Sequence, residues 1–339
     1  MSDINIGLVA ENQNLSEFEI TENFSCVRFL DQNKERFELE FNLEKGTSFN
    51  TFFIRSHEEL FIIHPPEKQY LNTFNKVVSS FCDQFKLDKI NFISGHINPQ
   101  IIETIKNIST QFQNTTITCS NPGYKLISEL WNQRNPTLEN FIEIQLPEIN
   151  IIKKELNLEL DNISLELIPI PTARWPGGLI IYERNQEILL SEKIFSAHIA
   201  SSDWSETNRV STEIDRKHFY DCLMAPMSNQ VVSITEKIAD YDIKTIAPLH
   251  GPAIEYSFKS FLNDYIRWGE NLSTNNPKIT LIYASAYGNT ASIGDALAKG
   301  INRTSVEVES INCEFTPNDV LIKSIQNADG YLIGSPTLG

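Results

Sequence analysis

The sequence predicts an α/β protein of two parts, a four-layer αββα sandwich followed by an incomplete doubly wound parallel sheet. Three observations lead to this fold class. The chain has 339 residues, which is too long for one ordinary single-core domain. Residues 1–270 contain two similar halves in which strands precede helices, a pattern that suits two sheets packed face to face with helices outside. A polar linker that ends in proline, residues 271–277, then precedes alternating strands and helices over residues 278–339.

The composition is that of an ordinary globular protein, with 41% hydrophobic and 21% charged residues. The 28 lysines and arginines against 44 aspartates and glutamates give a net charge of −16, which disfavours nucleic acid and anionic membranes as partners. No apolar run approaches the ~20 residues that span a bilayer. The N-terminus lacks the features of a secretory signal, so we expect a cytoplasmic protein without a transmembrane segment.

In the first half, short β-branched or aromatic runs between polar turns predict strands. These strands cover residues 37–42, 47–56, 59–66, 89–96 and 115–120. Apolar residues at helical spacing predict helices over residues 70–85, 100–112 and 123–133.

The second half repeats the pattern. Residues 146–171 are rich in strands, and residues 178–192 resemble a hairpin that turns at Arg184, Asn185 and Gln186. A long helix is predicted over residues 216–241, and an apolar strand over residues 243–252 is broken at Pro248.

After the linker, the chain supplies three strands and two helices of a parallel sheet. This arrangement leaves one apolar sheet edge unpaired, which is a liability in a finished protein. We therefore expect residues 278–339 to be the N-terminal part of a larger α/β domain.

The motif SAYGNT, residues 285–290, lies between a predicted strand and a predicted helix. Ser285, Asn289 and Thr290 supply hydroxyl and amide donors, and Gly288 permits a tight turn. The amides of the first helical turn point toward this loop, so it suits a dianionic phosphate. No lysine follows the glycine, which excludes a Walker-type nucleotide loop. The alternative is an ordinary helix start capped by serine or threonine.

A phosphate held by neutral donors resembles the FMN loop of flavodoxins. The segment GSPTLG, residues 334–339, follows the third strand, where flavodoxins place a loop beside the isoalloxazine ring. The resemblance implies that one set of residues contacts FMN: Ser285, Tyr287, Gly288, Asn289, Thr290, Ser335, Pro336 and Thr337.

Over nearly its whole length the chain resembles the flavodiiron proteins, which join a metallo-β-lactamase-like αββα domain to a flavodoxin domain. The stretches TARWPGGLIIY, LLSEKIFSAHIASS and IKTIAPLHGP carry the resemblance. In that family the metal ligands come from a H-x-E-x-D-H loop, a histidine before Trp-Pro, a bridging aspartate and a histidine in a later SHG segment. Here the HINPQI stretch stands at the first loop.

Transferred position by position, the resemblance implies a degraded diiron site. His96 and His250 stand at the first and last histidines. Asn98, Gln100 and Ile101 replace the glutamate, aspartate and second histidine of the loop, while Arg174 and Lys193 replace the next histidine and the bridging aspartate. Iron needs anionic oxygen and imidazole ligands, and arginine does not deprotonate. We therefore expect no iron here, or only substoichiometric iron.

Two buried cations need neutralisation. The sequence offers lowering of the lysine pKa, a carboxylate from Glu192 or Asp203, or a small anion or ordered water between Arg174 and Lys193, and we favour the last of these. Other side chains are expected to be structural. We expect His57, His64, His198 and His218 to be surface or capping residues. Trp175, Trp204 and Trp268 are expected to be packing residues, and Cys82 and Cys222 to lie in the core. With five widely spaced cysteines and no C-x-x-C pair, neither disulfides nor a thiolate metal site is predicted.

The resemblance implies an oxidoreductase subunit that passes electrons from NAD(P)H through FMN toward the reduction of oxygen to water, with nitric oxide as the alternative acceptor. NAD(P)H would enter through a C-terminal reductase domain that this sequence lacks. A head-to-tail homodimer, or a heterodimer with a ligand-complete paralogue, is implied. The alternatives are a non-catalytic structural or regulatory subunit and a metallo-hydrolase, which would need a H-x-H-x-D-H loop.

Overall fold

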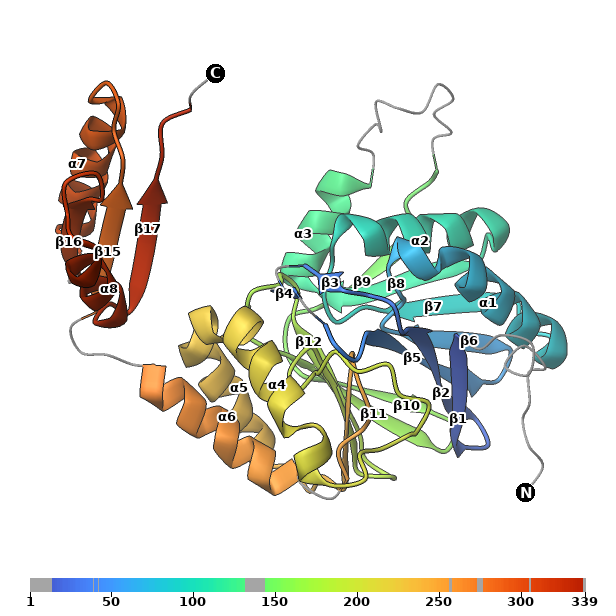
Figure 1. The fold of residues 1–339 in the computed structure, drawn as a ribbon. Coiled ribbons are helices and arrows are strands. Elements are labelled where there is room, and N and C mark those ends of the chain that lie inside the picture. Colours follow the sequence, from blue (N-terminus) through green and yellow to red (C-terminus); the bar gives the residue numbers. More distant parts are fainter. Residues whose placement is uncertain are drawn as a thin grey trace. The chain divides into compact units, whose positions relative to one another are not determined.

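The computed structural model describes residues 14–38, 40–41, 43–131, 144–255, 258–272, 277–304 and 306–337. The chain divides into two compact units, residues 1–272 and 273–339, and each is described by itself (Figure 1). Some residues of the predicted segments lie outside the described residues: 39 and 42 of a strand, 132–133 of a helix, 273–276 of the linker and 338–339 of the GSPTLG segment.

The first sheet of the larger unit has seven strands in the order β1-β2-β5-β6-β7-β8-β9. Pairing is antiparallel from β1 to β6 and parallel from β6 to β9. The strands are β1 (Leu15–Thr21), β2 (Phe24–Asp31), β5 (Thr47–Ser56), β6 (Glu59–Ile63), β7 (Lys89–Ile93), β8 (Thr115–Ser120) and β9 (Glu148–Ile152). Its outer face is covered by α1 (Leu71–Phe85), α2 (Pro99–Gln111) and α3 (Asn121–Leu130).

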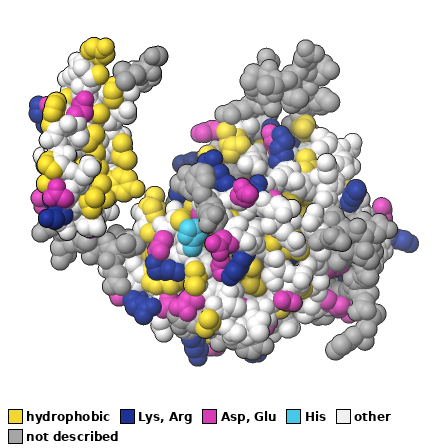
Figure 2. Space-filling model, in the orientation of Figure 1, with side chains coloured by type: hydrophobic (Ala, Val, Ile, Leu, Met, Phe, Trp, Pro, Cys, Tyr) yellow, Lys and Arg dark blue, Asp and Glu magenta, His cyan; other side chains and the backbone are white. Residues whose placement is uncertain are grey.

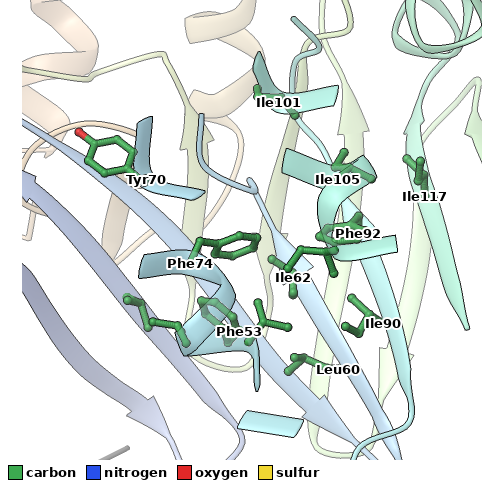
Figure 3. Close-up of a cluster of buried hydrophobic side chains, with 14 of the residues drawn as sticks. Phe53, Leu60, Ile62, Tyr70, Phe74, Ile90, Phe92, Ile101, Ile105 and Ile117 are labelled. Carbon is green, nitrogen blue, oxygen red and sulfur yellow. The ribbon is translucent and has the colours of Figure 1, made fainter. Parts of the chain in front are cut away.

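Alternation along the strands and helical spacing along α1 and α2 direct apolar side chains into one layer between sheet and helices. Phe53, Leu60 and Ile62 from the sheet face Phe74 of α1 and Ile105 of α2 (Figure 3). All five side chains are buried. This core fixes the position of the loop after β7.

The second sheet has five strands in the order β10-β11-β12-β13-β14. They are β10 (Leu156–Leu160), β11 (Ile163–Pro169), β12 (Leu179–Glu183), β13 (Ile188–Glu192) and β14 (Thr245–Pro248). The predicted hairpin is confirmed, because β12 and β13 pair antiparallel around residues 184–187. The two sheets share a buried core, which includes Phe24 and Phe52 of the first sheet and Leu165 and Leu179 of the second. The helices α4 (Glu213–Phe219), α5 (Ser228–Ala239) and α6 (Phe258–Leu272) cover the outer face of the second sheet, so the predicted αββα sandwich is confirmed.

Three local predictions were wrong or incomplete. The long helix predicted over residues 216–241 is interrupted by a π-helix, η4 (Tyr220–Met224), and a short 3-10 turn, η5 (Ala225–Met227), because Pro226 has no amide to continue an α-helix. The strand predicted over residues 37–42 is a pair of two-residue strands, β3 (Arg36–Phe37) and β4 (Glu40–Phe41). The helix α6 was not predicted.

The smaller unit is a parallel sheet in the order β16-β15-β17, formed by β15 (Lys278–Tyr283), β16 (Glu307–Asn312) and β17 (Gly330–Gly334). Its helices are α7 (Asn289–Ile301) and α8 (Asn318–Gln326). In chain order this is a 2-1-3 arrangement, the start of a flavodoxin-like sheet. Tyr331 and Ile333 of β17 are 62% and 73% exposed, and Figure 2 shows hydrophobic side chains gathered on this unit.

Candidate functional site

His96 lies in the loop that follows the carboxyl end of β7, an inner strand of the larger unit's first sheet. Its Nδ1 lies 2.5 Å from Oε1 of Glu192, at the end of β13, and both side chains are buried. Burial alone would raise the pKa of Glu192, but the charge of His96 and its hydrogen bond outweigh burial and hold that pKa below its ordinary value. Nε2 of His96, on the other side of the ring, has no hydrogen-bond partner among the described residues.

The other positions of this loop have structural roles. The side chain of Asn98 caps α2, accepting a hydrogen bond from the amide of Ile101 at 2.9 Å, and donates one to Glu67 at 3.1 Å. Gln100 is exposed on the first turn of α2. Ile101 lies in the core between sheet and helices (Figure 3). None of the three side chains is placed to hold a metal together with His96.

His250 follows β14, in the turn that includes Gly251 at φ +87°. Its Nδ1 donates to the carbonyl oxygen of Ser48 at 2.7 Å, so the lone pair lies on Nε2, which is buried without a hydrogen-bond partner among the described residues. Burial, followed by the nearby His198 and Lys193, lowers the pKa of His250 well below its ordinary value. His96 and His250 therefore each present a buried Nε2 and are held through Nδ1 by an oxygen atom, as metal-ligating histidines usually are.

Lys193 and Arg174 share one carboxylate, that of Glu38. Nζ of Lys193 donates to Glu38 Oε1 at 2.7 Å, and Nε of Arg174 lies 3.5 Å from Oε2. The indole Nε1 of Trp175 also donates to Glu38 Oε1 at 2.9 Å, while Lys193 Nζ lies 3.8 Å from the centre of the Trp175 ring. The Lys193 side chain is only 1% exposed, so this cation is held inside the protein.

Burial alone would raise the pKa of Glu38, but the charge of Lys193 and the hydrogen bonds from Lys193 and Trp175 outweigh it, and the pKa lies below its ordinary value. Of the two carboxylates that the sequence offered as alternatives, Glu192 pairs with His96 and also interacts electrostatically with Lys193, whereas Asp203 is exposed. The favoured anion or ordered water between Arg174 and Lys193 stays a prediction. A carboxylate does neutralise the cations, but it comes from a segment without a recognisable motif.

Phe37 fills space between the histidines. Its ring centre lies 4.6 Å from that of His198 and 4.9 Å from that of His250, and its side chain is buried. Together with Glu38 and Glu40 it forms a group that we call the cover residues, all from the short hairpin β3–β4. Nε2 of His198 lies 2.6 Å from Glu40 Oε2.

Two of the four histidines expected at the surface are buried. His57 and His218 are exposed, with side chains 79% and 48% accessible. His64 and His198 are interior, and burial lowers the pKa of His64 to about 4. An isolated histidine has no neighbouring sequence pattern that predicts whether its side chain is buried, so the sequence did not indicate the burial of His64 and His198. Cys82 is in the core as expected, whereas Cys222 is only half-buried.

In the smaller unit the two loops proposed for FMN lie together at the carboxyl ends of β15 and β17. The amide of Ala284 donates to the carbonyl of Gly334 at 3.0 Å, and a Cβ placed on Gly334 would lie 3.1 Å from Cγ2 of Thr290. This is the point where the strand order reverses, the usual ligand position in such sheets. Tyr287 is 87% exposed beside it.

The first of these loops has the shape of an anion cradle. Gly288 caps α7 with φ +80°, and nothing lies within 4 Å of the position of a Cβ. Ser285 Oγ accepts a hydrogen bond from the amide of Ala291, which leaves the amides of Asn289 and Thr290 without partners inside the helix. The amide of Ser285 donates to Glu314 Oε2 at 2.7 Å, so a carboxylate already contacts this loop. These donors fit a phosphate group.

The second loop, Ser335, Pro336 and Thr337, follows β17 without regular structure.

In the described part of the chain, no helix is long and apolar enough to cross a membrane.

Comparisons with known proteins agree with both units. A family model described as ODP family beta lactamase matches residues 47–251. Diflavin flavoprotein A 6 of Nostoc sp. PCC 7120 is 34% identical over 319 residues, covering 94% of this chain and 53% of that protein. Diflavin flavoprotein A 4 of Synechocystis sp. PCC 6803 is 31% identical over 312 residues, covering 90% and 49%. This chain thus spans about half the length of the curated relatives it matches.

Among solved structures, the metal-soaked flavodiiron core of Flv1 from Synechocystis sp. PCC6803 is similar, with a TM-score of 0.71 and 30% identity. The match covers 96% of this chain and 78% of that one. The family model alone covers more than half of the sequence. The chain therefore belongs to the ODP family of β-lactamase-like proteins, in the flavodiiron group that its relatives represent.

Proposed function

We propose that this chain is part of a flavodiiron-type oxidoreductase subunit that carries electrons through FMN and does not bind iron in its own β-lactamase-like pocket. The observation that carries this proposal is the buried ammonium of Lys193, held at 2.7 Å by Glu38. By the resemblance, Lys193 stands where a bridging aspartate would join two irons. A cation at that position opposes a metal ion instead of binding it.

The ligands that remain in the pocket do not fit iron. His96 and His250 offer two imidazole nitrogens, but the nearby carboxylates are engaged, Glu192 by His96 and Glu38 by Lys193 and Trp175. Iron in such sites needs anionic oxygen. The lack of a free carboxylate beside the two histidines also argues against a metallo-hydrolase, which needs a metal-activated water.

FMN, when bound, would accept two electrons together and release them singly. The contribution of this chain is to bind and orient it. The amides of Asn289 and Thr290 and the hydroxyl of Ser285 would hold the phosphate, and the loop of residues 335–337 would lie beside the ring. Tyr287 and Thr290 complete the proposed contacts.

We further propose that electrons enter from NAD(P)H and leave toward oxygen on a ligand-complete partner in a head-to-tail dimer. The test measures oxygen consumption by the full-length protein with NAD(P)H, alone and mixed with a ligand-complete homologue. We expect slow consumption alone and faster consumption in the mixture. Fast turnover by the protein alone, with stoichiometric iron, would contradict the proposal.

A structural subunit is distinguished by the FMN loop. Ser285→Ala should weaken FMN binding and reduce the flux of the mixture. Ser292→Ala, which removes a hydroxyl that donates to the Gly288 carbonyl, serves as the matched control. Unchanged flux in Ser285→Ala protein that has lost FMN would favour a structural subunit.

A further inference from the structure

A second group of potential metal ligands lies beside the pocket, outside the positions that resemble the diiron site. Glu40, His218 and Cys222 each offer one ligand atom, and these three atoms lie within 4.8 Å of one another. They come from β4, α4 and η4, so Glu40 is remote in sequence from the other two. Among the described residues, no other group of three or more such side chains was found.

His218 and Cys222 are four residues apart on one continuous helical segment, so they share a face. Sγ of Cys222 lies 3.8 Å from Nε2 of His218. In a tetrahedral zinc site with Zn–S of about 2.3 Å and Zn–N of about 2.0 Å, neighbouring ligand atoms are roughly 3.5 Å apart. The observed separation needs only a small side-chain adjustment.

Glu40 supplies an oriented carboxylate. Its side chain is 1% exposed, and Oε2 lies 2.6 Å from Nε2 of His198, whose Nδ1 is in turn 2.7 Å from Oγ1 of Thr47. The second oxygen, Oε1, faces Nε2 of His218 at 3.8 Å, which is too far for a hydrogen bond. A histidine that fixes one carboxylate oxygen and directs the other toward an ion is a common arrangement around metals.

Open space lies beside Glu40 and His218. A cavity of about 280 Å³ is lined by Glu40, His198 and His218 together with Leu43, Glu44, Ile214 and Asp215. Two lysines of neighbouring segments are paired with other carboxylates, Lys217 with Asp221 at 2.5 Å and Lys45 with Asp215 at 2.6 Å.

We propose that Glu40, His218 and Cys222 bind a Zn²⁺ ion, with His198 orienting the carboxylate and water as the fourth ligand. Oxygen, imidazole and thiolate ligands together suit this borderline ion. Because Glu40 is a cover residue, the ion would link the β3–β4 hairpin to α4. The site is separate from His96 and His250 and does not depend on the proposed electron-transfer function.

The test is a Zn²⁺ titration of the purified, chelator-stripped protein against a chromophoric competitor. We expect one Zn²⁺ per chain, with affinity reduced about tenfold or more in Cys222→Ser and in His218→Gln. Matched controls are Cys313→Ser and His57→Gln, which make the same changes at partly or fully exposed positions outside the cluster and should leave affinity unchanged. Tryptophan fluorescence checks that each variant folds.

Co²⁺ provides an independent readout. A sulfur-to-cobalt charge-transfer band should appear in the wild type and in the double variant His96→Gln/His250→Gln, and should be absent in Cys222→Ser. The proposal is overturned if the wild type binds no Zn²⁺, or if Cys222→Ser and His218→Gln bind it as the wild type does. Loss of the ion in the His96→Gln/His250→Gln protein with retention in Cys222→Ser would place it in the other pocket and also overturn the proposal.

Discussion

Replacing Glu38 by glutamine removes the charge that neutralises Lys193 and leaves the shape of the side chain nearly unchanged. An ion pair at about 4 Å has roughly 4 kcal/mol of gross attraction at an effective dielectric of 20. Solvent weakens this, because the Glu38 side chain is 24% exposed, whereas Lys193 at 1% exposure cannot reach water easily. We expect Glu38→Gln to lower the free energy of unfolding by about 2–3 kcal/mol, less than the ~3–5 kcal/mol typical of a fully buried pair.

Tryptophan fluorescence during denaturant unfolding is a suitable assay, because all four tryptophans lie in the larger unit: Trp131, Trp175, Trp204 and Trp268. Glu44→Gln, an exposed glutamate of the same region, is the matched control and should change stability by less than about 0.5 kcal/mol. Adding Lys193→Met to Glu38→Gln should recover at least half of the loss, since it removes the unpaired cation. A Glu38→Gln protein as stable as the wild type, or no recovery in the double variant, would refute this reasoning.

Four further predictions follow from the same contacts. Because the pKa of Glu38 is lowered, its carboxylate stabilises the fold above the ordinary pKa of 4.5, and this contribution is lost as pH falls through the lowered value. The difference in the free energy of unfolding between wild type and Glu38→Gln should therefore disappear in acid. The pKa of His64 is lowered to about 4, so the free energy of unfolding should fall by about 3 kcal/mol as pH decreases from about 6.5 to 4. Unfolding of wild type and His64→Leu across this range tests this prediction, and an equal pH dependence of the two free energies would contradict it. Gly95→Ala should destabilise the protein by about 1–3 kcal/mol in the same unfolding assay, because the new Cβ would lie 2.6 Å from both His64 Cε1 and Glu192 Cγ. An unchanged stability would show that these two buried side chains can move aside without loss of stability. Glu314→Gln should tighten FMN binding several-fold in a flavin-fluorescence titration, since it removes a negative charge 2.7 Å from the amide of Ser285, beside the proposed phosphate position. Weaker binding would contradict that phosphate position.

The sequence predicted the sandwich and the elements around the pocket because strand alternation and helical spacing are local signals. The family resemblance pointed to His96, Arg174, Lys193 and His250, because each stands at a position of a family motif. Glu38 could not be found in this way: it lies 155 residues from Lys193, in a predicted strand that carries no recognisable motif, and only the topology brings the two together.

The errors have the same origin. His64 and His198 look like surface histidines in the sequence, but the packing of both sheets buries them. Cys222 was expected in the core from helical spacing, yet the π-helix and Pro226 interrupt that spacing, and the thiol lies half-buried beside His218. Side chains whose role depends on contacts between distant segments were the ones that local patterns did not reveal.

The central claim is that, in the pocket of His96 and His250, the Lys193 cation paired with Glu38 takes the place of metal ions. Iron quantification after anaerobic Fe²⁺ reconstitution and desalting tests it most directly, with His250→Gln as the matched variant. We predict no iron that depends on His250, and none gained in Arg174→His/Lys193→Asp, because Asn98, Gln100 and Ile101 still offer no ligands. Close to two irons per chain in the wild type, lost in His250→Gln, would contradict the account.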